Sequence, residues 1–326
     1  MHTKVNVVIP AYKPDEKLIK IFEMLSKQSV TVEKIIVMNS TVVGGSNAEQ
    51  NADTDEVRTL CIKHDYDIKN NFIEIYNIPQ AEFDHGATRN LGASHVSTDC
   101  EFIVFMTQDA VPYDELLIEK LMAPFSDEQI GASYARQLAG ENSSLAEKFT
   151  RGFNYPDEDR IKTVSDIDTI GVKAFFCSNV CAMYRRSVYE ELGRFVDRAI
   201  FNEDMVYANK LLKSGYNIAY CSKAKVVHTH DYSGMQQFKR NFDLAVSQKM
   251  NPQAFDGISS ESEGIKYVKA AFLYFLRHGR PFLIIPFGIN CVYKYAGYRM
   301  GKRYESLPKE KIMKYTSNPG FFNKER

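Results

Sequence analysis

Tryptophan is absent from this sequence, and Lys plus Arg equal Asp plus Glu at 41 each, so the formal net charge at pH 7 is zero. A motif that depends on an indole ring is therefore excluded, and the overall charge does not indicate a nucleic-acid partner. The six cysteines show no Cys-x-x-Cys spacing, which excludes the usual paired-cysteine zinc site. Isolated cysteines in apolar surroundings are typical of reduced cytosolic thiols.

Long hydrophobic runs are also missing. The longest, at 281–293, is interrupted by Pro286, Gly288 and Asn290, whereas an ordinary membrane span needs about 20 apolar residues. The N-terminal apolar run is too short for a signal peptide. We therefore predict a cytosolic protein whose contact with a membrane would be peripheral.

Charge is distributed unevenly along the chain. Residues 264–326 contain thirteen Lys or Arg and three Asp or Glu, a net of +10, which leaves −10 for residues 1–263. The basic part also contains apolar residues at helical spacing, so we predict that residues 251–326 form a basic amphipathic helical extension. Such a segment either lies on an anionic membrane surface or packs as a helical hairpin on the core or in a homodimer.

The central segment of the chain is the apolar run Phe102–Met106. Its aromatic and β-branched residues predict a strand buried on both faces, and the polar Thr107-Gln108-Asp109 follows directly. Asp109 is therefore expected at the carboxyl end of a buried strand, where ligands bind in open α/β sheets. Taken alone, an Asp at this position is also a common turn former.

Strand-like and helix-like segments alternate along most of the chain, which predicts an α/β fold with a mainly parallel sheet flanked by helices. The polar segment 140–168 is expected to be a long loop. The other predicted strands are Val5–Ile9, Lys34–Met38, Phe72–Tyr76, Phe175–Tyr184, Asn217–Cys221 and Ala224–Val227.

Three further places carry candidate functional side chains. Arg89 is an unusual cation in a helix of small residues, which makes it a candidate functional residue. The alternative interpretation is an arginine at an ordinary surface position. Glu203 and Asp204 precede a helical pattern, where carboxylates often serve only as dipole partners. His228 and His230 end a predicted strand, and their spacing points both rings the same way, so at least one of them is a candidate metal ligand.

Six short motifs in this order resemble the family 2 glycosyltransferases of the A-type fold, and within them the bacterial rhamnosyltransferases. The resemblance covers about residues 5–245. The motifs are Val8-Ile9-Pro10-Ala11-Tyr12, His85-Gly86-Ala87-Thr88-Arg89-Asn90, Thr107-Gln108-Asp109-Ala110, Asn202-Glu203-Asp204, His228-Thr229-His230 and Gln237-Phe238-Lys239-Arg240-Asn241-Phe242.

The sequence departs from the family pattern at three places. The Asp-x-Asp metal motif survives only as Gln108-Asp109-Ala110, so an amide replaces one carboxylate. The acidic residue usual after the second strand is Asn39. The Gln-x-x-Arg-Trp pattern of processive relatives is approached by Gln237-x-x-Arg240 but lacks its tryptophan.

The resemblance implies an A-type catalytic domain over residues 1–250, with a nucleotide-sugar half at 1–115 and an acceptor half at 116–250. It also implies a role for each matching residue. Asp204 would be the base, and Glu203 would orient the base or the acceptor. Asp109 with His230 or His228 would hold Mg²⁺ or Mn²⁺, and Arg89 would assist at the phosphates. The residues expected at the nucleotide sugar are Pro10, Ala11, Tyr12, Asn39, Arg89, Gln108 and Asp109.

The expected activity is inverting transfer of L-rhamnose, with dTDP-L-rhamnose as donor, to a lipid-linked saccharide or growing cell-surface polysaccharide at the inner face of the membrane. Two alternatives stay open. One is a family 2 transferase of another sugar, such as a galactofuranosyl or N-acetylhexosaminyl donor. The other is a non-catalytic nucleotide-sugar-binding assembly protein, which the altered metal motif favours and the intact Glu203-Asp204 pair disfavours.

Overall fold

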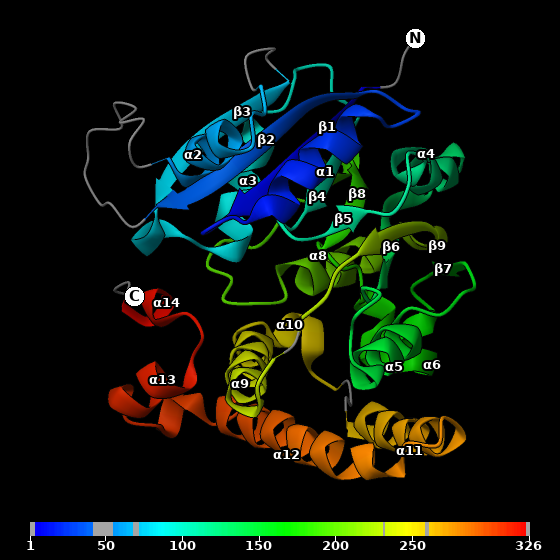
Figure 1. Ribbon diagram of the computed structural model, residues 1–326, viewed down its shortest axis with the longest axis vertical. Coiled ribbons are helices and arrows are strands. Elements are labelled where there is room, and N and C mark those ends of the chain that lie inside the picture. Colours follow the sequence, from blue (N-terminus) through cyan, green and yellow to red (C-terminus); the bar gives the residue numbers. More distant parts are fainter. Residues whose placement is uncertain (1–3, 42–54, 68–71, 231, 258–260, 324–326) are drawn as a thin grey trace.

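A computed structural model describes residues 4–41, 55–67, 72–230, 232–257 and 261–323, with side chains omitted at 261–263. One mixed β-sheet lies at the centre of the molecule (Figure 1). Its strands are β1 (Val5–Ala11), β2 (Val32–Thr41), β3 (Ile73–Pro79), β4 (Phe102–Met106), β5 (Val111–Pro112), β6 (Ile130–Leu138), β7 (Arg160–Lys162), β8 (Cys181–Arg185) and β9 (Asn217–Val227).

Helices cover both faces of this sheet and form the whole C-terminal part of the described chain (Figure 1). They are α1 (Glu16–Ser26), α2 (Glu56–Lys63), α3 (His85–Ser94), α4 (Leu117–Met122), α5 (Leu145–Asn154), α6 (Asp166–Ile170), α7 (Arg186–Glu191), α8 (Glu203–Lys213), α9 (Gly234–Met250), α10 (Pro252–Phe255), α11 (Glu261–Arg277), α12 (Ile284–Gly301), α13 (Lys309–Tyr315) and α14 (Pro319–Asn323).

The strand order creates a switch point between β1 and β4. The strands β3, β2, β1 and β4 lie side by side and run parallel. Beyond β4 the sheet is mixed, because β8 is antiparallel to both β4 and β6. The chain leaves β1 in one direction and returns on its other side at β4, so their carboxyl ends border the crevice where α/β sheets bind ligands.

Two hydrophobic clusters fill the space between the sheet and its helices. On one face, Leu18 and Phe22 of α1 and Leu121 of α4 pack against the strands. On the other face, Tyr189 of α7 and Tyr207 of α8 pack against Phe105 and Tyr184 of the central strands, which gives the aromatic cluster of that side. Burial on both faces explains the continuous apolar sequence of β4, and the predicted α/β fold is confirmed.

The strand predictions are correct in place and differ in extent. The central strand Phe102–Met106 has the predicted bounds. The two strands expected at 217–221 and 224–227 form one strand, β9, with a register irregularity opposite Ala135 and Arg136. The expected strand at 175–184 is wrong in its first half, where residues 171–175 form a 3₁₀ helix before β8.

The long loop expected at 140–168 is wrong, because this segment contains α5, β7 and α6. Ser144 caps α5 by accepting a hydrogen bond from the backbone N–H of Glu147. Within the helix, Arg151 pairs with Glu147 at 2.7 Å. The local sequence does carry signs of this helix, namely Ser144-x-x-Glu147 at its start and the spacing of Leu145, Phe149 and Phe153, and the loop prediction overlooks them.

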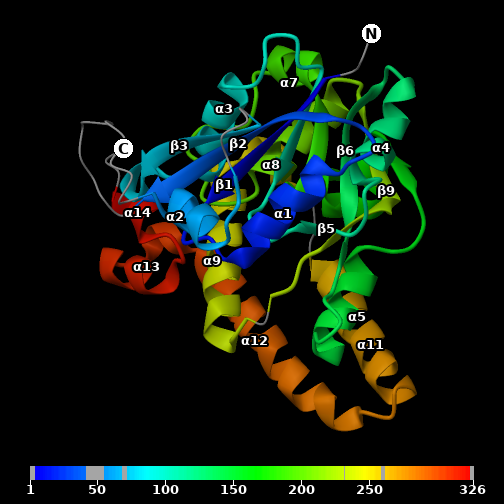
Figure 2. The same cartoon turned by 45° about the horizontal axis from the view of Figure 1, so that its top comes forward.

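Helix α12 lies against α9 and brings the C-terminal extension onto the rest of the molecule (Figure 2). The contact depends on two glycines one helical turn apart. A Cβ at Gly297 would lie 2.1 Å from the carbonyl oxygen of Phe238, and one at Gly301 would lie 2.3 Å from that of Phe242. Of the helices in the described ranges, none combines the length and the apolarity that crossing a bilayer would require.

The last described residues also pack onto α9. Thr316 donates a hydrogen bond from its hydroxyl to Oδ1 of the buried Asp243 at 2.7 Å, and the backbone N–H of Ser317 donates to Oδ2 at 2.8 Å. Phe321 of α14 joins Phe242 in a small hydrophobic cluster. The C-terminal helices are therefore held to α9 by polar and apolar contacts.

Candidate active site

The carboxyl ends of β1 and β4 are joined by one side chain. Gln108, which follows β4, accepts a hydrogen bond from the backbone N–H of Tyr12 at 2.7 Å and donates one to the Tyr12 carbonyl at 2.9 Å. A carboxylate could accept the first bond but would repel the carbonyl oxygen. This explains in physical terms why an amide stands at position 108, and it leaves Asp109 as the ionisable group of the motif.

Asp109, His228 and His230 come together on the same side of the sheet. Oδ1 of Asp109 lies 3.4 Å from Nε2 of His228, and Oδ2 lies 3.3 Å from Nε2 of His230. One ligand atom from each residue lies within 4.8 Å of the other two, which is the spacing of groups around a shared ion. A carboxylate and two imidazoles form a suitable ligand set for a divalent cation.

Gln137 determines which nitrogen of His228 is free to bind. Arg151 donates a hydrogen bond from Nη1 to Oε1 of Gln137, so this atom must be the amide oxygen. The same oxygen lies 3.0 Å from Nδ1 of His228, which must then carry the proton and donate. Nε2 of His228 is left with its lone pair, and it lies 2.7 Å from Nε2 of His230 and 3.4 Å from Oδ1 of Asp109. Hydrogen bonds of this kind, made by the ring nitrogen that does not bind the ion, orient metal-binding imidazoles.

The three groups have charge states suited to cation binding. Burial lowers the pKa of His228 and lowers the pKa of His230 to about 3, so both imidazoles are neutral at physiological pH. Burial alone would raise the pKa of Asp109, but its polar neighbours, His228 first among them, hold that pKa below the usual value. A neutral imidazole and an ionised carboxylate are the forms that bind metal.

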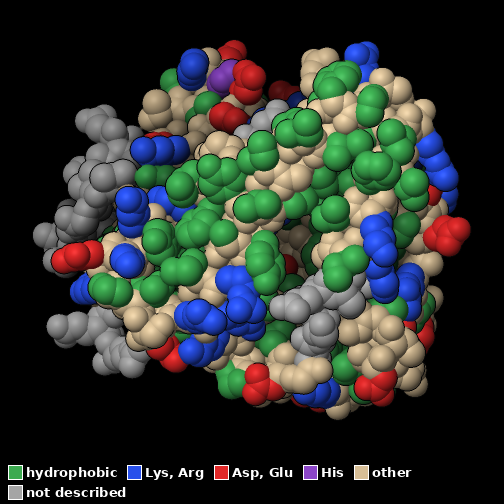
Figure 3. All heavy atoms as spheres, turned by 90° about the horizontal axis from the view of Figure 1, so that it is seen from below, with side chains coloured by type: hydrophobic (Ala, Val, Ile, Leu, Met, Phe, Trp, Pro, Cys, Tyr) green, Lys and Arg blue, Asp and Glu red, His purple; other side chains and the backbone are tan. Residues whose placement is uncertain are grey.

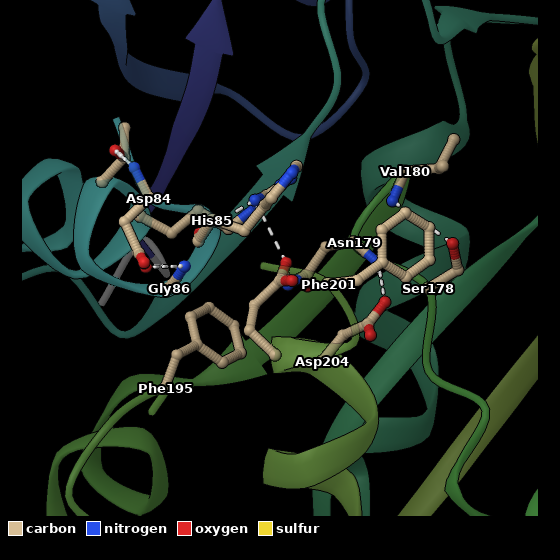
Figure 4. A network of polar contacts seen from close by, with 12 residues as sticks. Asp84, His85, Gly86, Ser178, Asn179, Val180, Phe195, Phe201 and Asp204 are labelled. Carbon is tan, nitrogen blue, oxygen red and sulfur yellow. Dashed lines mark hydrogen bonds and ion pairs between the residues drawn. The ribbon is translucent and has the colours of Figure 1, made fainter. Parts of the chain in front are cut away.

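A second polar cluster lies at the start of α8, around Glu203 and Asp204 (Figure 4). The backbone N–H of Asn179 donates to Oδ2 of Asp204 at 3.2 Å, and its side-chain Nδ2 donates to Oε1 of Glu203 at 3.1 Å. The hydroxyl of Tyr184 in turn donates to Oδ1 of Asn179 at 2.8 Å. One asparagine therefore fixes both carboxylates.

The two neighbouring carboxylates have opposite pKa shifts. Burial raises the pKa of Asp204 to about 7, and the charge of Glu203 adds to this shift. Burial acts on Glu203 in the same direction, but Arg89 and other partners outweigh it and lower its pKa. Glu203 therefore stays ionised while Asp204 can exchange a proton near neutral pH, as a general base requires.

Arg89 lies behind this pair. Its Nη1 is 3.1 Å from Oε1 of Glu203, with both side chains only 6% exposed, and the same nitrogen donates to the carbonyl of His85 at 3.0 Å. The predicted contact of Arg89 with phosphates does not fit this burial. Glu203 is likewise enclosed, and its connection to Asp204 runs through Asn179.

The residues expected near a nucleotide occupy the carboxyl ends of β1 and β2. Pro10 and Ala11 end β1, and the half-exposed Tyr12 accepts a hydrogen bond at its hydroxyl from Gln80 at 3.0 Å. Asn39 is buried and donates to Oδ1 of Asn77 at 2.8 Å. Oδ1 of Asn39 has no hydrogen-bond partner within the described part of the chain.

Comparison with known proteins decides the family. The model of the family described as Glycosyl transferase family 2 matches residues 6–193. The chain belongs to glycosyl transferase family 2. It is 34% identical over 323 residues to the O-antigen chain rhamnosyltransferase RfbN of Salmonella typhimurium, covering 98% of this chain and 96% of RfbN. It is 33% identical to the O-antigen chain rhamnosyltransferase WbaN of Salmonella anatum, covering 93% and 90%.

Solved structures of low sequence identity share the fold. The mannosyltransferase PcManGT from Pyrobaculum calidifontis, in complex with GDP-Man and Mn²⁺, matches with a TM-score of 0.53 and 13% identity, covering 98% of this chain and 85% of that one. TarS 1-349 from S. aureus, in complex with UDP-GlcNAc, matches with a TM-score of 0.50 and 12% identity, covering 93% and 92%. The A-type fold and the glycosyltransferase activity predicted from the motifs are therefore confirmed.

Sequence reasoning missed three residues that organise this family 2 site. Asn179 holds both carboxylates, Gln137 orients His228, and Arg151 fixes the amide of Gln137. Asn179 lies in the predicted strand 175–184, Gln137 lies in β6, for which no strand is predicted, and Arg151 lies in the segment expected to be a loop. The available signal was that each is a polar residue in or beside an apolar segment, where a buried polar group needs a partner.

The two polar clusters of the glycosyltransferase are physically connected. Gln137 donates from Nε2 to the hydroxyl of Ser178 at 3.1 Å, and the next residue, Asn179, contacts both carboxylates. The segment from Ser178 to Asn179 thus links the histidine cluster to Asp204. This arrangement places a candidate cation site and a candidate base at two ends of one hydrogen-bonded network.

Proposed function

We propose that the protein is an inverting glycosyltransferase that moves L-rhamnose from a nucleotide-diphosphate donor to a growing cell-surface polysaccharide. The rhamnosyltransferase names of two relatives over nearly the whole chain support the sugar. The observation that carries the chemistry is Asp204, a partly buried carboxylate held by Asn179 with a pKa raised to about 7.

Asp204 is proposed as the catalytic base. It accepts the proton of the acceptor hydroxyl while that oxygen forms a bond to the anomeric carbon. The bond from this carbon to the donor phosphate oxygen breaks, and the nucleoside diphosphate leaves with the electron pair. Glu203 stays ionised and, with Asn179, holds Asp204 in place. A single displacement of this kind inverts the anomeric configuration.

Asp109, His228 and His230 are the residues that would hold Mg²⁺ or Mn²⁺. A divalent cation at this site would neutralise charge on the leaving diphosphate as a Lewis acid. The PcManGT structure, a complex with GDP-Man and Mn²⁺, supports a cation and a nucleotide sugar in this fold. Pro10, Ala11, Tyr12 and Asn39 are proposed to line the nucleotide side, with dTDP-L-rhamnose as donor.

The acceptor is proposed to be lipid-linked, and the enzyme to work peripherally on the cytoplasmic face of the cell membrane. The O-antigen names of the relatives support a cell-surface polysaccharide as product. The basic C-terminal extension, residues 251–326, supports contact with an anionic membrane surface. In this proposal the catalytic domain comprises residues 1–250, with a nucleotide-sugar half before residue 116 and an acceptor half after it.

Thermal unfolding with a panel of nucleotide sugars, each with and without Mn²⁺, tests the donor. A ligand present at about 100 times its dissociation constant should stabilise the protein by about 2.7 kcal/mol. We expect the rhamnose donor with Mn²⁺ to stabilise most. A larger effect of a galactofuranose or N-acetylhexosamine donor would reassign the sugar. Donor binding without any turnover, whether the donor is added alone or together with lipid-linked acceptors extracted from membranes, would favour a non-catalytic binding protein.

A further inference from the structure

The outer side of α11 and α12 presents a continuous apolar face. On α11, Ile265, Val268, Phe272 and Leu276 recur every three or four residues and are exposed. The connection between the two helices, residues 278–283, and α12 itself continue this face with further exposed side chains. These are Phe282, Ile285, Ile289, Val292 and Tyr295. We name these nine residues the outer apolar face. Figure 3, viewed from below, shows hydrophobic side chains gathered over this side of the molecule.

The segment that carries this face, residues 264–304, has charged side chains of one sign only. No Asp or Glu occurs anywhere in residues 264–304. Lys or Arg residues occur eight times in the same segment, at Lys266, Lys269, Arg277, Arg280, Lys294, Arg299, Lys302 and Arg303. Figure 3 shows Lys and Arg side chains beside the hydrophobic ones. An exposed apolar stripe in a segment whose only charged side chains are cations matches the interface of an anionic bilayer.

The inner sides of the same helices are already occupied. Ala271 and Phe275 of α11 and Phe287 of α12 pack with Phe149 of α5. Helix α5 also carries Arg151, which contacts Gln137 in the histidine cluster. The outer apolar face therefore points away from the sheet. Helix α5, on which α11 and α12 pack, contacts the candidate active site through Arg151.

We propose that the outer apolar face lies in the headgroup region of an anionic bilayer and holds the enzyme there through α11 and α12. This deepens the proposed function, since it names the surface by which a lipid-linked acceptor would be met. The face inserts its apolar side chains, and the surrounding cations contact lipid phosphates.

A second copy of the chain is a poorer occupant of this face. A symmetric dimer would bring the same patch of both copies together. The exposed cations of one segment, among them Lys269, Arg277 and Arg299, would then lie near those of the other, with no Asp or Glu between residues 264 and 304 of either chain to compensate. Like charges opposed across an interface disfavour association.

Cosedimentation of the full chain with vesicles tests the proposal. We expect binding to vesicles of mixed phosphatidylcholine and phosphatidylglycerol and little binding to phosphatidylcholine alone. Replacing Phe272, Ile285 and Val292 together by Ser should weaken this binding by at least about a hundredfold. The matched control replaces Ile62, Ile161 and Val164, which are exposed apolar residues elsewhere, and should bind as the wild type does.

Charge gives an independent variant. Replacing Lys269, Arg277 and Arg299 by Gln should weaken binding to the anionic vesicles by roughly a hundredfold. Binding of the wild type should also fall at 1 M salt, where the Debye length is about 3 Å. Removing α11 to α14 is a poor test, because it would expose the apolar residues that these helices cover on α9.

The absence of tryptophan provides a second readout that needs no disruptive change. A single Ile285→Trp probe should shift its emission to shorter wavelength when anionic vesicles are added, and an Ile62→Trp probe should not. An unshifted Ile285→Trp probe, or serine variants that bind as the wild type does, would overturn the proposal. So would a dimer that the serine variant dissociates. Donor-dependent thermal stabilisation tests the proposed function separately, because it requires no vesicle.

Discussion

The backbone N–H of Asn179 donates to Oδ2 of Asp204 at 3.2 Å, while the side chain of the same asparagine holds Glu203. Asn179 therefore fixes the relative positions of a carboxylate that stays ionised and one that titrates near neutral pH. The distinction between the two roles comes from burial and from Arg89, which pairs only with Glu203 at the distances observed.

The rate of transfer should depend on pH through Asp204. Its pKa is raised to about 7 and its ionised form is the active one, so kcat/KM should fall about tenfold per unit below that pH. Glu203→Gln should move the midpoint to lower pH, because the charge of Glu203 contributes to the raised pKa. The pH dependence of initial rates measures both. A midpoint that is the same in Glu203→Gln as in the wild type and in the remote control Glu190→Gln would contradict this account.

Arg89→Met should destabilise the fold strongly. The substitution leaves Glu203 charged and buried without its partner, which should lower the free energy of unfolding by about 3–5 kcal/mol. Removing Arg89 should raise the pKa of the buried Glu203, which Arg89 lowers in the wild type, so this loss should shrink as the pH falls from the raised pKa of the variant toward the lowered pKa of the wild type. Urea unfolding measures the effect at each pH.

Two variants control for this effect. Arg160→Met removes an exposed pair with Asp166 and should cost less than about 1 kcal/mol. Adding Glu203→Gln to Arg89→Met should recover part of the lost stability, because the uncompensated charge is removed. Equal effects of Arg89→Met and Arg160→Met would show that the buried pair does not matter.

Gln137→Leu should weaken Mn²⁺ binding by about 10- to 100-fold. Without the amide oxygen, His228 is free to place its proton on Nε2 and so lose the lone pair of that atom. Calorimetric titration of the protein with Mn²⁺ measures the affinity. Ser178→Ala is the matched control, since it removes the partner of Nε2 of Gln137 but leaves the amide oxygen beside His228, and it should leave Mn²⁺ affinity within about threefold of the wild type. A similar loss in both variants would argue against control of the tautomer.

Asp109→Ala should remove the effect of metal on donor binding. In the wild type we expect Mn²⁺ to increase affinity for the nucleotide sugar, because Asp109 would help to hold a cation that would neutralise charge on the diphosphate. His230→Ala should give a smaller loss of the same kind. Donor titrations with and without Mn²⁺ provide the comparison. If Mn²⁺ changes donor affinity equally in wild type and Asp109→Ala, this metal role is wrong.

The sequence was most informative where function depends on the end of a strand or the start of a helix. Asp109 was predicted correctly at the end of β4, because a doubly buried strand is recognisable from its continuous apolar residues. Glu203 and Asp204 were found at the start of α8 by their place before a helical pattern and by the family motif.

Residues that act through distant partners could not be predicted in the same way. Gln108 contacts the backbone of Tyr12, 96 positions earlier, and Arg89 is enclosed by a helix more than a hundred positions later. Burial of a polar group depends on the complete fold, and periodicity in a short window does not report it. Helix α5 differs, because Ser144-x-x-Glu147 and the spacing of Leu145, Phe149 and Phe153 were available in a short window.

Turnover and donor binding of Asp204→Asn, measured side by side, test the central claim most directly. The amide keeps the shape of the carboxylate but cannot accept the acceptor proton. The assay contains the rhamnose donor, Mn²⁺ and lipid-linked acceptors extracted from membranes. Under these conditions we expect the rate of nucleotide release by Asp204→Asn to fall by about 10²–10⁴-fold relative to the wild type. Its donor dissociation constant should stay within about threefold of the wild-type value, since the proposed donor contacts lie elsewhere. Wild-type turnover by Asp204→Asn would contradict the assignment of Asp204 as the base.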